Sequence, residues 1–465
     1  MLNQDTICAI STPAGVGGIA VIRVSGNEAF EVCQKCFQSR KADFAISQQK
    51  PYTLHFGNIV DKNGEEIDEV LLSIFRSPHS FTGEDTVEIS CHGSAFVQSK
   101  ILQILLSLGC RMASAGEFSM RSFYNGKMDL SQAEAVADLI ASKSEAMHRI
   151  AISQMRGGFS KELSLLRGKL LDFISLIELE LDFSEEDVEF ADRSNLQILA
   201  QEIREKIVRL RDSFSTGNAI KNGVPVALVG KTNVGKSTLL NSLLQEERAI
   251  VSDIAGTTRD TIEDTIVISG ISFRFVDTAG IRRTSDPIEN IGIERTYEKI
   301  QNSQIVIWLV DGTETTEERE FIKDKIANIF SDQKLMLVIN KIDTLSSEQK
   351  TEIIQEYESQ NIETICISAK NDFAIEDIKE RLVRIVGLGQ IDSGDVIISN
   401  ARHYEALCGA ASAIERVIDG IEQHISGDFL SQDIREASYY LGEITGEISA
   451  DHILGNIFSK FCIGK

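Results

Sequence analysis

A short run near the middle of the chain has the residue types and the spacing that phosphate binding requires. Gly230 to Ser237 read G-K-T-N-V-G-K-S, which matches the pattern G-x-x-x-x-G-K-[ST]. The glycines let the backbone wrap closely, so that N–H groups near a helix N-terminus point at phosphate oxygens. A strand-like run (226–229) precedes the loop and a helical run (238–244) follows it, which is the context that such a loop needs. Lys236 is predicted to face the β- and γ-phosphates, and Ser237 to bind Mg²⁺. The predicted nucleotide contacts in this loop are Asn233, Val234, Gly235, Lys236, Ser237 and Thr238.

A second pattern indicates that the base is guanine. The sequence N-K-I-D at 340–343 closes an apolar run, at the carboxyl end of a predicted parallel strand, where ligands bind in such sheets. The Asp343 carboxylate can accept hydrogen bonds from N1–H and N2–H₂ of guanine, and adenine lacks both donors there. We expect Asn340 to tie this loop to the phosphate loop. Taken alone, such a string can be a solvated turn, but its order after the phosphate loop favours base recognition. The predicted base-side residues are Asn340, Lys341, Asp343, Ser368, Ala369 and Lys370.

The sequence D-T-A-G follows another predicted strand (273–276), and we expect it to contact Mg²⁺ through a water molecule and the γ-phosphate through a backbone amide. Its residues are Asp277, Thr278, Ala279 and Gly280. The next residue is Ile281, at the position where Ras-type GTPases have a glutamine that orients the attacking water. This protein must therefore position its water by other means.

The segment 252–260, S-D-I-A-G-T-T-R-D, offers one such means. Thr258 is predicted to bind Mg²⁺ when the γ-phosphate is present. The amide oxygen of Asn233 is able to face a monovalent cation, and a K⁺ ion there would put positive charge between the phosphates, as an arginine finger otherwise does. The alternative is that Asn233 only braces the loop. The K⁺ ligands predicted here are Asn233, Ser252, Ile254 and Thr257, and the nucleotide contacts are Ser252, Asp253, Ile254, Ala255, Gly256, Thr257 and Thr258.

The composition is that of a soluble globular protein. Of its residues, 42% are hydrophobic and 25% are charged. The length of 465 residues is enough for about three domains. No basic leader and no apolar run of about 20 residues is visible, and the cysteines are scattered, so we expect a cytoplasmic protein. Cys33 and Cys36 form a C-x-x-C that we interpret as structural. The net charge of −23 argues against nucleic-acid binding by bulk attraction, so an RNA substrate would need a basic partner or a local basic patch.

Periodicity divides the chain into three domains. We predict an N-terminal α+β domain (1–120), an α-helical bundle domain in two segments (121–221 and 388–465), and an inserted α/β Ras-like P-loop GTPase domain (222–387). Leucine and isoleucine stripes predict the bundle helices, and Ser131 with Glu134 predicts a capping box that opens a helix over 131–147. Strands are predicted at 6–10, 18–24, 53–59, 70–75 and 85–92, and helices at 27–38 and 94–108. We interpret the glycine-rich segment 12–18 as a strand connection and not as a phosphate site.

Several strings together resemble the MnmE (TrmE) family, GTPases of tRNA wobble-uridine modification. They are D-T-I-x-A at 5–9, T-P-x-G-x-G-G-I at 12–19, S-F-T-G-E-D at 80–85, G-T-T-R-D at 256–260 and F-C-I-G-K at 461–465. The resemblance spans the whole chain. One departure is C-H-G-S at 91–94, where the family commonly has a second glycine.

The resemblance implies an activity that composition does not show. The family acts on tRNA with a flavoprotein partner, MnmG, as a heterotetramer, and adds an aminomethyl or carboxymethylaminomethyl group at carbon 5 of the wobble uridine. The one-carbon unit comes from a 5-formyl- or methylene-tetrahydrofolate bound by the N-terminal domain. Matching positions imply folate contacts at Arg23, Glu88, Lys127 and Lys465, a water-orienting role for Glu289, and a nucleophile or carrier at Cys462.

Each of these residues has a simpler interpretation. Arg23 and Glu88 could be surface charges of strands, Glu289 a first-turn glutamate of a helix, and Cys462 a cysteine that packs a helical terminus. A folate site that draws on both the N-terminal domain and Lys465 is built most simply at a subunit contact, so a homodimer is expected. Two other classes stay open, a ribosome-assembly GTPase and a scaffold GTPase, and neither needs a folate site.

Overall fold

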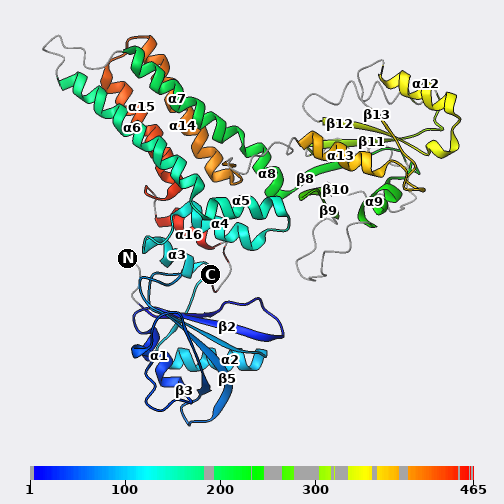
Figure 1. The fold of residues 1–465 in the computed structure, drawn as a ribbon. Helices are drawn as coiled ribbons and strands as arrows, with labels where there is room; N and C mark the ends of the chain where they lie inside the picture. The colour runs from blue at the N-terminus through cyan, green and yellow to red at the C-terminus, as the bar shows by residue number, and fades with distance from the viewer. Residues whose placement is uncertain are drawn as a thin grey trace. The chain divides into compact units, whose positions relative to one another are not determined.

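The structure is a computed structural model, and it describes most of the chain (Figure 1). The described residues are 5–182, 193–231, 233–245, 264–276, 303–315, 319, 334–358, 364–386, 396–448, 451–459, 461 and 464. They form two compact units. The first unit comprises residues 1–140, 153–203 and 409–465, and the second comprises 141–152 and 204–408.

The N-terminal part of the first unit is built on a seven-stranded sheet of order β3-β4-β5-β6-β2-β1-β7. The strands are β1 (Ile7–Ile10), β2 (Gly17–Ser25), β3 (Phe37–Ser39), β4 (Thr53–Val60), β5 (Glu66–Phe75), β6 (Thr86–Gly93) and β7 (Arg111–Met112). Alternation decides which side chains are buried: Ile22 and Val24 of β2 enter the core, and Arg23 between them faces the other side of the sheet. The strands predicted from alternation are thus confirmed, with ends shifted by a few residues.

The helices predicted at 27–38 and 94–108 are confirmed as α1 (Ala29–Cys36) and α2 (Ala95–Ser107), and both pack on one face of this sheet. Cys33 and Cys36 lie on α1 and are buried in that core as free thiols. Burial raises the pKa of Cys33, and it raises the pKa of Cys36 to about 12. A thiol that resists ionisation is a poor nucleophile and a poor metal ligand, which fits the structural interpretation of the C-x-x-C.

Helices from both ends of the chain make up the rest of the first unit. They are α3 (Glu117–Tyr124), α4 (Leu130–Ala141), α6 (Gly158–Asp182), α15 (Gly427–Thr445) and α16 (Asp451–Ser459). The predicted stripe of α6 is buried, including Leu163, Leu170 and Phe173, and α6 packs against α15. The prediction of one bundle made from both flanks is therefore confirmed (Figure 1).

Three helices contribute residues to both units: α5 (Glu145–Met155), α7 (Arg193–Asp212) and α14 (Ala401–Glu422). The compact units therefore divide within these helices and not at residues 221 and 387. The three-domain boundaries at 120, 221 and 387 stay a prediction.

The helix predicted over 131–147 was wrong in two respects. The chain forms α4 and α5 with a break at 142–144, after which the Ser144 hydroxyl accepts a hydrogen bond from the Met147 amide at 3.2 Å. The capping box is Asp129 with Gln132: the Gln132 amide donates to Asp129 Oδ1, and the Asp129 amide donates to Gln132 Oε1, both at 2.9 Å. Ser131 is instead a buried residue inside α4.

The second unit contains a six-stranded sheet of order β13-β12-β11-β8-β10-β9, in which only β9 pairs antiparallel among the described strands. Its strands are β8 (Val224–Val229), β9 (Asp264–Ile268), β10 (Ile271–Val276), β11 (Ile305–Asp311), β12 (Lys334–Asn340) and β13 (Thr364–Cys366). Its helices include α8 (Phe214–Asn222), α9 (Lys236–Gln245), α12 (Ser347–Glu358) and α13 (Ile375–Val386). Because β8, β11, β12 and β13 run parallel, the loops that follow them meet at one edge of the sheet.

Candidate functional site

The phosphate loop connects β8 to α9, as its sequence predicts. Gly230 (φ +153°) and Gly235 (φ +102°) lie in backbone regions that L side chains rarely adopt. A Cβ at Gly230 would overlap the carbonyl oxygen of Leu309, and a Cβ at Gly235 would overlap Nδ2 of Asn340. Both glycines are thus required by close backbone or side-chain neighbours. Thr232 of this loop lies outside the described residues.

Lys236 is folded back over the loop at the start of α9. Its ammonium donates to the carbonyl oxygens of Gly230 at 2.5 Å and Lys231 at 2.6 Å. The residue is buried, and burial lowers the pKa of Lys236 below its usual range. A buried cation with only carbonyl partners is well placed to exchange them for phosphate oxygens. Ser237 and Thr238, at the N-terminal turn of α9, are exposed, and Val234 is buried.

Asn340 joins the base loop to the phosphate loop, which confirms the prediction made for it. It is buried, with 3% exposure, its Nδ2 donates to the carbonyl oxygen of Val234 at 2.8 Å, and its Oδ1 accepts from the amide of Ala369 at 3.0 Å. One side chain thus connects the loops that follow β8, β12 and β13. Because both of its polar atoms have partners, its orientation is determined.

The side chain expected to read guanine is also held in place. The Ser368 hydroxyl donates to Oδ1 of Asp343 at 2.7 Å, and this hydrogen bond is the main reason that the pKa of Asp343 is lowered. The Asp343 side chain is exposed, so its second oxygen is accessible to a ligand. Lys341 has a positive φ of 64°, and its Nζ donates to Asp311 at 2.5 Å. Ser368 and Ala369 are buried and Lys370 is exposed.

Asn233 is an exposed residue with a φ of +65°, a conformation that asparagine tolerates better than most residues. The structure therefore leaves its amide accessible, as a cation ligand would have to be.

Many other predicted site residues lie outside the described part of the chain. They are Ser252, Asp253, Ile254, Ala255, Gly256, Thr257, Thr258, Asp277, Thr278, Ala279, Gly280, Glu289, Cys462 and Lys465.

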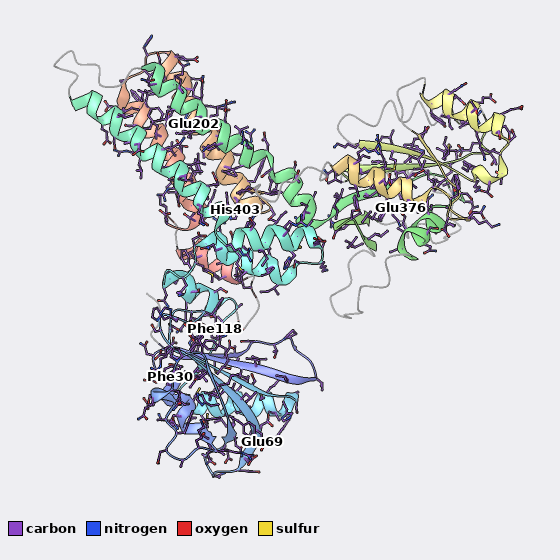
Figure 2. All side chains as sticks on the ribbon, viewed as in Figure 1. Phe30, Glu69, Phe118, Glu202, Glu376 and His403 are labelled. Atoms are coloured by element: carbon purple, nitrogen blue, oxygen red, sulfur yellow. The ribbon has the colours of Figure 1, made fainter. Side chains whose placement is uncertain are left out.

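The first unit holds the residues implied for folate. Arg23 and Glu88 are cross-strand partners on β2 and β6, and they form an ion pair with an Nη2–Oε1 distance of 2.8 Å. The Arg23 guanidinium also lies over the rings of Phe81 (5.1 Å) and Phe118 (5.5 Å), and Figure 2 labels Phe118 on α3. Lys127 donates to the carbonyl oxygen of Pro78 at 2.8 Å. Arg23 and Glu88 are thus a partly buried cross-strand pair, and their contact with a folate stays a prediction.

The C-terminal tail contacts this same N-terminal domain. The Ser11 hydroxyl donates to the carbonyl oxygen of Gly464 at 3.1 Å. Gly464 has a φ of +94°, and a Cβ there would overlap the carbonyl oxygen of Ile10. The tail therefore reaches the N-terminal domain of its own chain. A second subunit is therefore not needed to bring the tail to this domain, and the homodimer stays a prediction.

Sequence reasoning missed a buried ionic network in the first unit. Arg121 on α3 is 1% exposed, and its guanidinium donates to Asp5 Oδ1 (2.8 Å), to Glu84 Oε1 (3.1 Å) and to Glu117 Oε1 (3.1 Å). Arg111 adds a second cation to Glu117 at 2.6 Å. Burial alone would raise the pKa of Glu117, but its hydrogen bonds to Arg111, Ser114 and Arg121 outweigh this and lower it to about 2. Only Asp5 in the D-T-I-x-A string and Glu84 in the S-F-T-G-E-D string pointed toward this network.

A phosphate loop and a base loop at the carboxyl ends of a mainly parallel sheet define a Ras-like P-loop GTPase. Comparison with known proteins makes this more specific. The profile described as "MnmE helical domain" matches residues 130–462, and that described as "GTP-binding protein TrmE N-terminus" matches residues 6–127.

Curated relatives match along their whole length. The tRNA modification GTPase MnmE of Bacteroides fragilis is 57% identical over 468 residues, covering 100% of this chain and 100% of the relative. The proteins of the same name from Bacteroides thetaiotaomicron and Flavobacterium johnsoniae are 56% and 55% identical, with the same coverage. The chain belongs to the MnmE family of tRNA modification GTPases, and it is a GTP hydrolase. None of the helices among the described residues is long and apolar enough to span a membrane.

Proposed function

We propose that this chain is a K⁺-stimulated GTP hydrolase that acts with the flavoprotein MnmG on tRNA. Together they would add an aminomethyl or carboxymethylaminomethyl group at carbon 5 of the wobble uridine, using a one-carbon unit from a tetrahydrofolate derivative. The observation that carries the proposal is the contact between Gly464 and Ser11, because it brings the end of the chain to the domain that holds Arg23 and Glu88. Two distant parts of the sequence that the resemblance assigns to one folate site thus belong to one compact unit.

The donors around the phosphate loop fit the two cations of the proposal. Ser237 offers an exposed hydroxyl at the start of α9, and with Thr258 it would hold Mg²⁺. Asn233 offers an exposed amide oxygen, and with Ser252, Ile254 and Thr257 it would hold K⁺. Bound there, K⁺ would supply positive charge next to the phosphates. Glu289 would position the attacking water by accepting a hydrogen bond.

The polar site of the N-terminal domain fits a folate. The pterin ring presents an amide and amino edge that pairs with a carboxylate such as Glu88, and the hydrogen bond from Arg23 orients that carboxylate. Side-chain exposures of 17% for Arg23 and 25% for Glu88 leave the pair accessible from one side. Lys127 and Lys465 are cations suited to the carboxylates of the folate tail. Cys462, two residues before Gly464 in the chain, is the proposed nucleophile or carrier for the one-carbon unit.

A homodimer and a basic partner complete the proposal. The outer face of the N-terminal sheet exposes Leu54 (67%), Phe56 (45%) and Leu71 (44%), and Phe56 and Leu71 are directly paired on β4 and β5. Such a patch favours a two-fold contact with a second copy of the chain. The net charge of −23 means that the flavoprotein in the heterotetramer would supply much of the attraction for tRNA. These reactions belong in the cytoplasm.

Two measurements test the proposal. Calorimetric titration of the purified protein with 5-formyltetrahydrofolate should show saturable binding, and Glu88→Gln should weaken it by about tenfold, as expected when a charge-assisted hydrogen bond becomes a neutral one. Mass spectrometry of tRNA from a strain that lacks this protein should show loss of the wobble-uridine modification. Normal modification in that strain would overturn the assignment, and absence of folate binding would overturn the one-carbon route.

A further inference from the structure

We propose that Asp311, outside the known nucleotide-binding sequences, is a positioning residue for guanine recognition that acts by holding Lys341. This inference rests on the assignment of residues 340–343 as the base loop. It concerns nucleotide affinity only, so it is independent of the proposed folate and tRNA chemistry.

The two oxygens of Asp311 have different partners. Oδ2 accepts from Lys341 Nζ at 2.5 Å, and Oδ1 accepts from the amide (3.0 Å) and the hydroxyl (2.8 Å) of Thr313. The carboxylate is therefore anchored on its own loop by one oxygen and presents the other to the lysine. An ammonium that would otherwise move freely on a flexible stem is fixed in one place.

Backbone pairing brings these two residues together. Asp311 is the last residue of β11 and is paired in register with Asn340, the last residue of β12. The Gly312 amide donates to the carbonyl oxygen of Asn340 at 2.9 Å, which closes the two loops against each other. Lys341 follows with φ +64°, so its side chain leaves the strand direction on the side of Asp311.

The ion pair between Asp311 and Lys341 is partly buried, so it holds the lysine more strongly than a fully exposed ion pair would. The Asp311 side chain is 15% exposed and that of Lys341 is 39% exposed. Burial alone would raise the pKa of Asp311, but the hydrogen bonds from Lys341 and Thr313 outweigh this and lower it. Asp311 is therefore ionised at neutral pH and is available to hold the lysine.

The same loop also contacts the phosphate loop. Glu314, with a 7% exposed side chain, lies 3.5 Å from the ammonium of Lys231, the second residue of the G-K-T-N-V-G-K-S sequence. Acidic residues of one loop thus face a lysine of the base loop and a lysine of the phosphate loop. This arrangement supports a positioning role because it connects both nucleotide-binding loops to β11.

Loss of the Asp311 charge should therefore weaken nucleotide binding and leave the rate of GTP hydrolysis nearly unchanged. The stem of Lys341 lies in the chain between Asn340 and Asp343, so fixing its end orders the loop that must meet the base. Without the charge of Asp311 the loop would sample other arrangements, and the nucleotide would dissociate faster. The phosphate contacts of Lys236 and Ser237 would remain, so turnover of bound GTP should hardly change.

The experiment compares Asp311→Asn, Lys341→Met and the double variant in the full-length protein. Stopped-flow release of a fluorescent GDP should be about tenfold faster in Asp311→Asn, which is ~1.4 kcal/mol. The KM for GTP in KCl should rise similarly, with kcat changed by less than about twofold. If Asp311 acts through Lys341, the double variant should lose no more than the more damaged single variant. Glu376→Gln, which removes an exposed carboxylate that is paired with Lys379 on α13 of the same domain (Glu376 is labelled in Figure 2), is the matched control and should match the wild type.

Asp343→Asn separates the possible failures. If it does not weaken GTP binding, the base-loop assignment itself is wrong and this inference falls with it. If it weakens GTP binding while Asp311→Asn releases GDP at the wild-type rate, the positioning role alone is overturned. Additive losses in the double variant would also overturn it, because they would show that Asp311 does not act through Lys341.

Discussion

Replacing Gly464 by alanine tests how the C-terminal tail contributes to the proposed folate site. Gly464 has φ +94°, which an alanine adopts only at a cost of ~1–2 kcal/mol. Its new methyl group would overlap the carbonyl oxygen of Ile10 and lie 3.1 Å from Cα of Ser11, so the tail must move. Movement also breaks the hydrogen bond from Ser11 to Gly464, worth ~1 kcal/mol. Together these terms disfavour the docked tail by about 2–3 kcal/mol, or roughly 30- to 150-fold.

The assay is calorimetric titration with 5-formyltetrahydrofolate. If the docked tail is part of the site, Gly464→Ala should weaken binding by at least about tenfold, with the estimate above as the upper range. GTP affinity should be unchanged because the nucleotide-binding loops belong to the second unit. Gly455→Ala is the matched control: Gly455 lies on α16, a Cβ there would meet nothing within 4 Å, and alanine in a helix is favoured by up to ~1 kcal/mol.

Wild-type folate affinity in Gly464→Ala would refute this reasoning and would remove the tail from the site. Equal losses in Gly464→Ala and Gly455→Ala would also contradict it, because they would indicate a general effect on the C-terminal segment. A measurement of the melting temperature accompanies both variants. Gly464→Ala should leave it nearly unchanged, because the apolar contact of Phe461 with the helical core lies three residues before Gly464.

The remaining predictions concern the GTPase reaction and stability. GTP turnover in KCl should exceed that in NaCl by at least about tenfold at matched ionic strength. Asn233→Ala should remove this difference while GTP binding persists. Equal rates in both salts would contradict the K⁺ site. Glu289→Ala should lower kcat by on the order of 100-fold with GTP affinity retained, whereas a glutamate that only favours a helix start would leave kcat near the wild-type value. The carboxylate of Glu117, with a pKa of about 2, should add about 3 kcal/mol of stability above its unfolded pKa, and this should be lost as the pH falls from about 4.5 to 2. Acid unfolding of Glu117→Gln should show a weaker pH dependence over that range, and an unaltered dependence would exclude Glu117 as its source.

The sequence by itself determined the nucleotide-binding loops and most of the strands. Phosphate binding needs fixed residue types at fixed spacing, so Gly230 to Ser237 identified their own function and local structure. The order of the nucleotide-binding sequences even predicted a contact across more than a hundred positions, that of Asn340 with the phosphate loop. The strands predicted at 18–24 and 85–92 likewise hold Arg23 and Glu88, which are paired on β2 and β6.

Only the tertiary structure decided features that depend on neighbours distant in the chain. The sequence allows two capping boxes at the start of α4, Ser131 with Glu134 and Asp129 with Gln132, and the second one forms. Ser131 is then buried and hydrogen-bonded to Ser160, a residue 29 positions away in the chain. The ion pairs of Arg121 join residues from three separate segments, and a single buried arginine produces no periodicity. The tail residue Gly464 reaches Ile10 from the other end of the sequence. Local patterns specify backbone conformation and the face that is buried, but which partner fills a given space is settled only when the segments pack.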